Sequence, residues 1–209
     1  MISSPLDVAP VIPVVVISDV ADAVPLARAL LAGGLGAIEV TLRSAAALDG
    51  VRAIAAEVPE LALGVGTILT ADQVKQAVDA GAKFLVSPGS TDRLLDAFDG
   101  AGVPFLAGCA TPSDVVRLAE RGITEAKLFP AEVVGGIAML KALAAPFAGM
   151  RFCPTGGVTA ATAPNYLALA NVGCVGGTWI AGVELQRAGG WSRITELAAQ
   201  AAGLRRAAG

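Results

Sequence analysis

The sequence predicts a (β/α)8 TIM barrel of minimal length, a fold of the α/β class. Short apolar runs alternate with Ala- and Leu-rich helical stretches along the chain of 209 residues, and such alternation is typical of a parallel sheet. The runs are nearly free of charge, as expected for strands that are buried on both faces. Strand–helix units of about 20 to 25 residues each account for a minimal barrel.

Each predicted element follows from a local pattern. The apolar runs that are predicted to be strands cover residues 11–17, 37–42, 61–66, 83–87, 103–107, 125–129, 151–155 and 172–176. Between them, apolar residues recur at intervals of three and four, as at Val115 and Leu118, which predicts helices with one apolar face. Thr70, Thr91 and Thr111 stand where helices would begin, because a threonine side chain can cap the first free backbone N–H groups.

An open, doubly wound sheet is the alternative fold, and it usually has fewer strands. Its nucleotide-binding loops are missing from this sequence. There is no GxxxxGKS/T motif, and neither Gly33-Gly-Leu-Gly36 nor Gly64-Val-Gly-Thr67 completes GxGxxG. No linker, low-complexity tract or block of charge divides the chain, so we predict one barrel domain over residues 1–209.

The composition excludes several classes of protein. Hydrophobic residues make up 55% of the chain and charged residues 16%, which excludes an intrinsically disordered protein. A formal net charge of -3 gives no basic field to attract nucleic acid, so we predict no nucleic-acid partner. The chain has no histidine, which excludes Ser-His triads, histidine-ligated zinc and histidine bases.

The apolar content also raises the question of a membrane. No charged residue occurs from 152 to 183, a stretch long enough to span a bilayer, but Pro154, Pro164 and Asn171 interrupt it. The N-terminus has no basic residue ahead of its apolar run, unlike a signal peptide. We therefore predict no membrane association. The three cysteines form no CxxC pair, which favours reduced core thiols and a cytoplasmic location.

Lys127 lies late in the run 125–129, near the end where (β/α)8 barrels place their chemistry. Of the other lysines, Lys75 and Lys141 fall on predicted helices, and Lys83 opens a strand at the opposite end. Burial disfavours a charged ammonium, and a neutral amine is the nucleophile that forms a Schiff base with a ketone. Lys127 is therefore either such a nucleophile or one half of an ion pair across the barrel mouth.

The segment 39–43 places charged side chains in an apolar strand. Because side chains alternate along a strand, Glu39, Thr41 and Arg43 share one face, which would point into the barrel. Glu39 could then act as a general acid and base, and Arg43 could grip a substrate carboxylate with its forked guanidinium. A Glu–Arg pair within the strand is the structural alternative, and it is costly in a barrel interior.

Polar residues and glycines also follow other predicted strands. Thr67 and Thr155 each place a hydroxyl at a strand end, where a helix cap or a turn is the alternative interpretation. Gly-Gly pairs follow the seventh and eighth strands, at 156–157 and 176–177. Paired glycines let backbone N–H groups approach an anion, and these two loops often form the phosphate site of such barrels. Tight turns that need a positive φ are the alternative.

Together these segments resemble the 2-keto-3-deoxy-6-phosphogluconate (KDPG) aldolase family, which also accepts 4-hydroxy-2-oxoglutarate. The matching segments occur in family order over nearly the whole chain: Glu39-Val-Thr-Leu-Arg43, Gly64-Val-Gly-Thr67, Ser87-Pro-Gly89, Lys127-Leu-Phe-Pro-Ala-Glu132, Arg151-Phe-Cys-Pro-Thr-Gly-Gly157 and Val175-Gly-Gly-Thr-Trp179. The resemblance implies a class I aldolase without metal or cofactor, assembled as a homotrimer. It would cleave KDPG, a phosphorylated 2-keto-3-deoxy sugar acid, to pyruvate and glyceraldehyde 3-phosphate.

The resemblance also implies roles for individual residues. Lys127 matches the Schiff-base lysine and Glu39 the acid/base. Arg43 and Thr67 match the site of the pyruvyl carboxylate. The residues that match the lining of the pocket are Pro88, Phe129 and Thr155, and those that match its phosphate end are Gly156, Gly157, Gly177 and Thr178. Threonine replaces the usual serine at 178, valine the usual alanine at 65, and alanine a frequent proline at 107, which bears on substrate preference rather than on the chemistry.

The sequence leaves three alternative functions. An aldolase of the same class could prefer 4-hydroxy-2-oxoglutarate or the galactonate-derived isomer, because only the contacts to the distal half of the substrate would differ. A non-catalytic phosphosugar-binding barrel would use the same loops, but it would need neither Lys127 nor Glu39. A metal-dependent pyruvate aldolase is disfavoured by the absence of histidine, although carboxylates can hold Mg2+.

Overall fold

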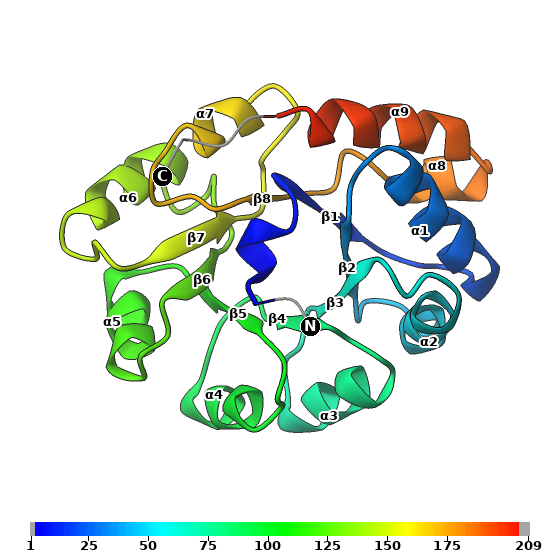
Figure 1. Ribbon diagram of the computed structural model, residues 1–209. Coiled ribbons are helices and arrows are strands. Elements are labelled where there is room, and N and C mark those ends of the chain that lie inside the picture. The colour runs from blue at the N-terminus through cyan, green and yellow to red at the C-terminus, as the bar shows by residue number, and fades with distance from the viewer. Residues whose placement is uncertain (1–2, 205–209) are drawn as a thin grey trace.

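Parallel strands form a barrel with helices around it in the computed structural model, which describes residues 3–204 (Figure 1). The strands are β1 (Val11–Val15), β2 (Ala37–Thr41), β3 (Ala62–Gly66), β4 (Phe84–Val86), β5 (Phe105–Cys109), β6 (Glu125–Leu128), β7 (Arg151–Pro154) and β8 (Val175–Gly177). They pair in the order β7-β6-β5-β4-β3-β2-β1-β8. Isolated bridges join Phe152 to Val172 and Thr155 to Gly176, so the barrel is nearly closed between β7 and β8. The predicted (β/α)8 fold is confirmed.

The helices lie outside the sheet, between the strands that they connect (Figure 1). They are α1 (Ala23–Ala32), α2 (Ala47–Glu57), α3 (Ala71–Asp79), α4 (Asp92–Asp99), α5 (Pro112–Glu120), α6 (Gly136–Ala144), α7 (Ala163–Leu167), α8 (Val183–Arg187) and α9 (Trp191–Ala202). Both α8 and α9 follow β8, and α9 packs against α1. This contact joins the last helix to the first, on the same side as the pairing of β8 with β1.

The three predicted helix starts are confirmed. The hydroxyls of Thr70, Thr91 and Thr111 each accept a hydrogen bond from the backbone N–H three residues further along, at the starts of α3, α4 and α5. At Thr70 and Thr111, the third residue also bonds back to the N–H of the cap, which completes a capping box. Local sequence therefore decides where each of these loops ends and its helix begins.

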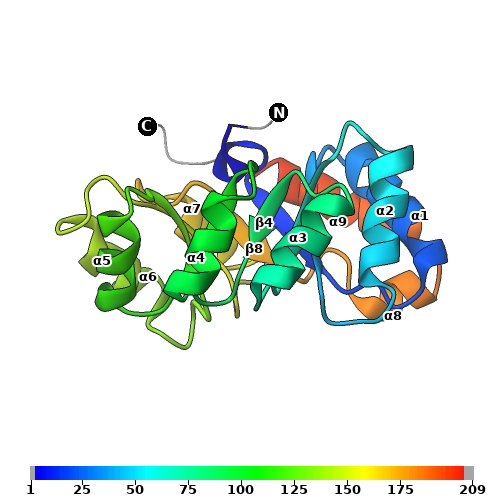
Figure 2. The same cartoon turned by 90° about the horizontal axis from the view of Figure 1, so that it is seen from below.

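One end of the barrel is covered by the short 3-10 helix η1 (Pro5–Asp7), which Figure 2 shows beside the N-terminus. The Ser4 hydroxyl donates to the carboxylate of Glu125, the first residue of β6, at 2.7 Å. Asp7 pairs with Arg151, the first residue of β7, at 2.6 Å. The chain thus covers the amino ends of its own strands, and the carboxyl ends remain open for a site.

Three strands differ from the prediction by two or more residues at an end, and the other five by a single residue at one or both ends. β5 runs over 105–109 rather than 103–107, because Pro104 has no N–H to donate and the strand continues through Gly108. β8 covers only 175–177, since Val172 makes just an isolated bridge. β1 ends at Val15, where the Val15 carbonyl accepts a hydrogen bond from the side chain of Thr41.

The uncharged stretch 152–183 contains most of β7, all of α7 and β8, and their loops, as predicted. Along residues 3–204, we find no helix with the length and apolar character that a membrane crossing needs. Cys109, Cys153 and Cys174 are buried and form no disulfide bond, which agrees with the interpretation of the cysteines as core thiols.

Candidate active site

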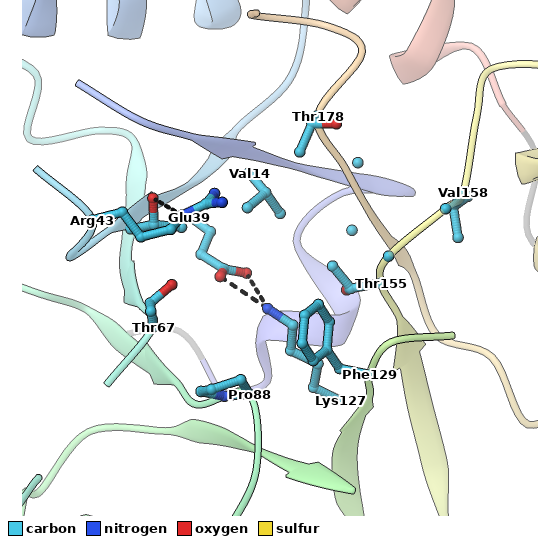
Figure 3. A pocket seen from close by; sticks show the side chains of 15 residues that line it. Val14, Glu39, Arg43, Thr67, Pro88, Lys127, Phe129, Thr155, Val158 and Thr178 are labelled. Atoms are coloured by element: carbon cyan, nitrogen blue, oxygen red, sulfur yellow. Dashed lines mark hydrogen bonds and ion pairs between the residues drawn. The ribbon is translucent and has the colours of Figure 1, made fainter. Parts of the chain in front are cut away.

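A cavity of about 340 Å³ opens at the carboxyl ends of the strands, opposite η1 (Figure 3). All of the residues predicted for the site line it. Gly176, from the predicted Gly-Gly pair 176–177, lines it as well, as do Val14, Thr41 and Val158, to which the sequence analysis assigned no role. The sequence could have indicated Thr41 as a site residue, because it shares a strand face with Glu39 and Arg43. Nothing in the sequence distinguishes Val14 and Val158 from other apolar residues.

Lys127 and Glu39 meet inside this cavity (Figure 3). The Lys127 amine, on β6, lies 3.0 and 3.3 Å from the two carboxylate oxygens of Glu39, on β2. Their side chains are only 5% and 4% exposed. At this distance a proton can pass from the ammonium to the carboxylate, which leaves a neutral amine facing the cavity. Lys127 thus forms the ion pair across the barrel that was one of the two predicted alternatives, and it also lines the cavity, where a nucleophile would have to lie.

The alternative of a Glu39–Arg43 pair within one strand is wrong. Glu39 turns toward Lys127, and the Nε of Arg43 instead donates to the Thr41 hydroxyl at 3.0 Å. Arg43 lies just beyond β2, where it is exposed at the mouth, and its guanidinium points over the cavity toward Val14 (Figure 3). A cation at the mouth and an amine–carboxylate pair below it can bind an anionic group and position the rest of the molecule near the amine.

The other lysines lie away from the cavity. Lys75 pairs with Asp79 along α3 at 2.5 Å. Lys83 donates to the backbone carbonyl of Leu61, at the amino end of its strand. Lys141 is exposed on α6. Of the four lysines, Lys127 is therefore the one that lies at the carboxyl end of the barrel.

Two thiols border Lys127 on the neighbouring strands. The Cys109 thiol donates to the Lys127 carbonyl at 3.5 Å, and burial raises the pKa of Cys109 to about 12, which makes it a poor nucleophile. Cys153 pairs with Lys127 in the β6–β7 register. A hydrogen bond with Cys174 is the main cause that lowers the pKa of Cys153, and burial opposes it. The Phe129 ring covers the amine from 5.5 Å.

Gly66 leaves the space that the Glu39 side chain occupies. A Cβ atom at Gly66, the last residue of β3, would overlap the Glu39 carboxylate. The two residues lie on paired strands, with Glu39 opposite Gly64 and Thr41 opposite Gly66. The glycine therefore allows the carboxylate to lie across β3 and reach Lys127.

Thr67 follows Gly66 in an unusual conformation. Among residues 3–204 it is the one non-glycine residue with a positive φ, of 61°. This left-handed conformation is unfavourable for a β-branched residue. The neighbouring backbone holds it, because the Gly66 carbonyl accepts from Leu42 and the Ile68 N–H donates to Val86. Strain of this kind is concentrated at functional sites, and here it brings the Thr67 side chain to the cavity.

The Gly-Gly loop after β7 lies at the far side of the cavity. Gly156 and Gly157 have φ values of 100° and 83°, which agrees with the alternative of a tight turn that needs a positive φ, and the loop also lines the cavity. The backbone N–H groups of Gly157 and Thr178 donate no hydrogen bond to any group of residues 3–204. Unsatisfied N–H groups in adjacent loops are suited to an anion such as phosphate.

The described side chains offer no group of three or more His, Cys, Asp or Glu residues that could hold a metal ion. The chemistry that this arrangement supports directly is that of an amine nucleophile beside a carboxylate.

The chain matches the family model described as KDPG and KHG aldolase over residues 2–197. The 2-dehydro-3-deoxy-phosphogluconate aldolase of Pseudoalteromonas atlantica is 49% identical over 192 residues, 92% of this chain and 89% of the relative. A Legionella pneumophila KDPG aldolase, solved with pyruvate as a covalent carbinolamine intermediate, has a TM-score of 0.93 and 41% identity, with coverage of 95% and 96%. The Zymomonas mobilis ZM4 enzyme, solved with 3-phosphoglycerate, has a TM-score of 0.90 and 44% identity, with coverage of 97% and 95%. With a match over most of its length and a site of the expected composition, the chain belongs to the KDPG and KHG aldolase family.

Proposed function

We propose that this chain cleaves KDPG to pyruvate and glyceraldehyde 3-phosphate through a Schiff base on Lys127. The observation that carries the proposal is the contact between the Lys127 amine and the Glu39 carboxylate inside the cavity. Membership of the family makes the chain a carbon–carbon lyase. The covalent carbinolamine of pyruvate in the Legionella relative supports an amine nucleophile of this kind.

The first half of the reaction forms the iminium. Glu39 takes a proton from the Lys127 ammonium, and the neutral amine attacks the C2 ketone of KDPG to give a carbinolamine. Glu39 then returns a proton to the C2 hydroxyl, which leaves as water. The product is a cationic iminium between Lys127 and C2, and this cation can accept the electron pair of a neighbouring bond.

The second half breaks the C3–C4 bond. Glu39 removes the proton of the C4 hydroxyl, the C3–C4 electron pair moves into the iminium, and glyceraldehyde 3-phosphate leaves. The enamine that remains is protonated at C3, and water hydrolyses the resulting iminium to release pyruvate and Lys127. The iminium withdraws electrons in this scheme, so no step requires a metal. We therefore expect full activity in excess EDTA, and loss of activity there would contradict the scheme.

The remaining predicted residues position the substrate. We assign Arg43 and Thr67 to the pyruvyl carboxylate, because both lie at the mouth of the cavity next to the Lys127–Glu39 pair. We assign the phosphate to the loops that carry Gly156, Gly157, Gly177 and Thr178, which the 3-phosphoglycerate in the Zymomonas structure supports. The residues that would enclose the chain of the substrate between these ends are Pro88, Phe129 and Thr155.

Borohydride reduction in the presence of pyruvate tests the proposal. Borohydride converts the iminium to a stable secondary amine, so intact mass should rise by one reduced pyruvyl group per chain. Peptide mapping should place that group on Lys127. Absence of any adduct in the native enzyme would overturn the Schiff-base mechanism.

The preference among substrates is a finer question. KDPG, its galactonate-derived isomer and 4-hydroxy-2-oxoglutarate share the pyruvyl half, so we propose that the distal loops favour the phosphorylated substrates. Comparison of kcat/KM for the three substrates tests this. A higher value for 4-hydroxy-2-oxoglutarate would establish the alternative preference.

The Thr178→Ala variant should lower kcat/KM for KDPG about tenfold, the scale of one hydrogen bond to a charged group. Deuterium exchange at the methyl group of pyruvate should be unchanged, because pyruvate has no distal group to contact Thr178. Steady-state cleavage and exchange monitored by NMR provide the two measurements. Equal losses in both would show that Thr178 supports the fold rather than the phosphate.

The Gly66→Ala variant should lower kcat by a factor on the order of 10², because a displacement of about 1 Å in a reacting group has effects of this size. The added methyl group would force the Glu39 carboxylate away from its present position. Gly149→Ala is the matched control, since a Cβ there meets no atom within 4 Å. A Gly66→Ala enzyme with native kcat would show that the position of Glu39 is not critical.

We also propose that residues 1–209 form one domain that assembles as a homotrimer in the cytoplasm. The support is the family resemblance for the trimer, and buried thiols that form no disulfide bond for a reducing compartment. Sedimentation equilibrium should give three times the mass of the chain, and a monomeric mass would reject the trimer. Cell fractionation tests the location.

A further inference from the structure

The Arg43 guanidinium is held by one neighbour. Its Nε donates to Thr41 Oγ1 at 3.0 Å, and within residues 3–204 its side chain makes no other hydrogen bond and no ion pair. The backbone of Arg43 is tied to the same residue, because its N–H donates to the Thr41 carbonyl at 2.8 Å. An exposed arginine without a carboxylate partner would otherwise sample many rotamers.

The Thr41 hydroxyl has a fixed direction. It is buried, at 1% relative exposure, and it donates to the Val15 carbonyl on β1 at 2.7 Å. A hydroxyl has one hydrogen, so Oγ1 can only accept from Arg43. The Val15 carbonyl thereby orients the lone pairs of Thr41 toward Nε, while both terminal nitrogens of Arg43 remain available above the cavity.

We propose that Thr41 is a positioning residue for carboxylate recognition: its hydroxyl, anchored on β1, holds Arg43 in the orientation that receives the pyruvyl carboxylate. The inference rests on the proposed function. A forked guanidinium binds a carboxylate through two parallel hydrogen bonds, which require a defined plane. If Arg43 is ordered before binding, less conformational entropy is lost when the carboxylate arrives. The carboxylate in turn sets the distance of C2 from Lys127.

The test uses the native chain and three variants, Thr41→Val, Thr41→Ser and Ser44→Ala. Thr41→Val keeps the shape but removes the hydroxyl, and Thr41→Ser restores it. Ser44→Ala is the matched control, because the Ser44 hydroxyl also donates to a β1-side carbonyl, that of Ile17, but does not contact Arg43. Thermal melts identify the folded variants. If Thr41→Val does not fold, Thr41→Ala takes its place.

The readout is the pyruvate concentration that gives half-maximal borohydride trapping, together with KM and kcat for KDPG cleavage. For Thr41→Val we expect half-saturating pyruvate and KM to rise about tenfold, the scale of one hydrogen bond to a charged group, with a smaller fall in kcat. Thr41→Ser and Ser44→Ala should stay within about twofold of the native enzyme, well below that scale. The maximal adduct should remain one per chain in every variant.

A double-mutant cycle separates positioning from stability. If Thr41 acts through Arg43, then Thr41→Val adds nothing to half-saturating pyruvate in an Arg43→Ala background. The inference would be overturned if Thr41→Val raised half-saturating pyruvate equally in the native and Arg43→Ala backgrounds. It would also be overturned if the Thr41→Val single variant had the native half-saturating concentration. These outcomes are distinct from failure of the proposed function, in which the native enzyme itself would give no adduct.

Discussion

The Lys127→Arg variant should give no borohydride adduct with pyruvate and should lose cleavage activity by about 10⁴-fold or more, the scale of removing a covalent nucleophile. A guanidinium stays protonated, so it cannot attack a ketone. It keeps the positive charge beside Glu39, however, and so avoids the penalty of a buried carboxylate without a partner. We therefore expect the variant to fold, which makes the loss specific to the chemistry.

Intact mass after reduction, peptide mapping and a cleavage assay measure these effects. Lys141→Arg is the control, because Lys141 is exposed on α6, away from the cavity. That variant should keep a full adduct and native kcat. An adduct on Lys83 or Lys141 in the native enzyme, or a remaining adduct in Lys127→Arg, would contradict the assignment of Lys127.

The Glu39→Gln variant has the second largest expected effect. Glutamine keeps the size of the side chain and an oxygen that can face Lys127, but it cannot take or return a proton. Loss of a positioned acid/base typically lowers a rate by about 10²–10⁴. Both carbinolamine dehydration and cleavage depend on that transfer, so kcat and the rate of adduct formation should fall together. KM should change much less, because Glu39 is not assigned to the carboxylate or the phosphate.

Exchange of the pyruvate methyl protons in D2O distinguishes this role from a structural one. If Glu39 only balances the charge of Lys127, Glu39→Gln should lower the melting temperature and leave exchange within a few-fold of native. If Glu39 moves the protons, exchange should fall with kcat. The cavity supports the second outcome, because the two carboxylate oxygens are 3.0 and 3.3 Å from the amine that forms the iminium.

Much of the barrel could be predicted because its signals are local. A strand that is buried on both faces must be apolar along its length, and a capped helix needs a short polar side chain, here threonine, at one position. The starts of α3, α4 and α5 are therefore visible in the sequence. Strand ends are less visible, because they depend on which neighbour is available for pairing. Gly108 continues β5, and Val172 makes only one bridge before β8, for this reason.

The candidate site likewise has features that the local sequence predicts and features that depend on distant contacts. The sequence by itself determined which residue types interrupt the apolar strands and at which end, and this was sufficient to name Lys127, Glu39 and Arg43. It did not decide their partners, because Lys127 and Glu39 are 88 positions apart and meet only when β2 and β6 face each other across the barrel. Only the tertiary structure decided that Glu39 turns to Lys127, that Arg43 rests on Thr41, and that Thr67 adopts a left-handed conformation. Each of these depends on contacts between strands, and the strands come together only when the sheet closes.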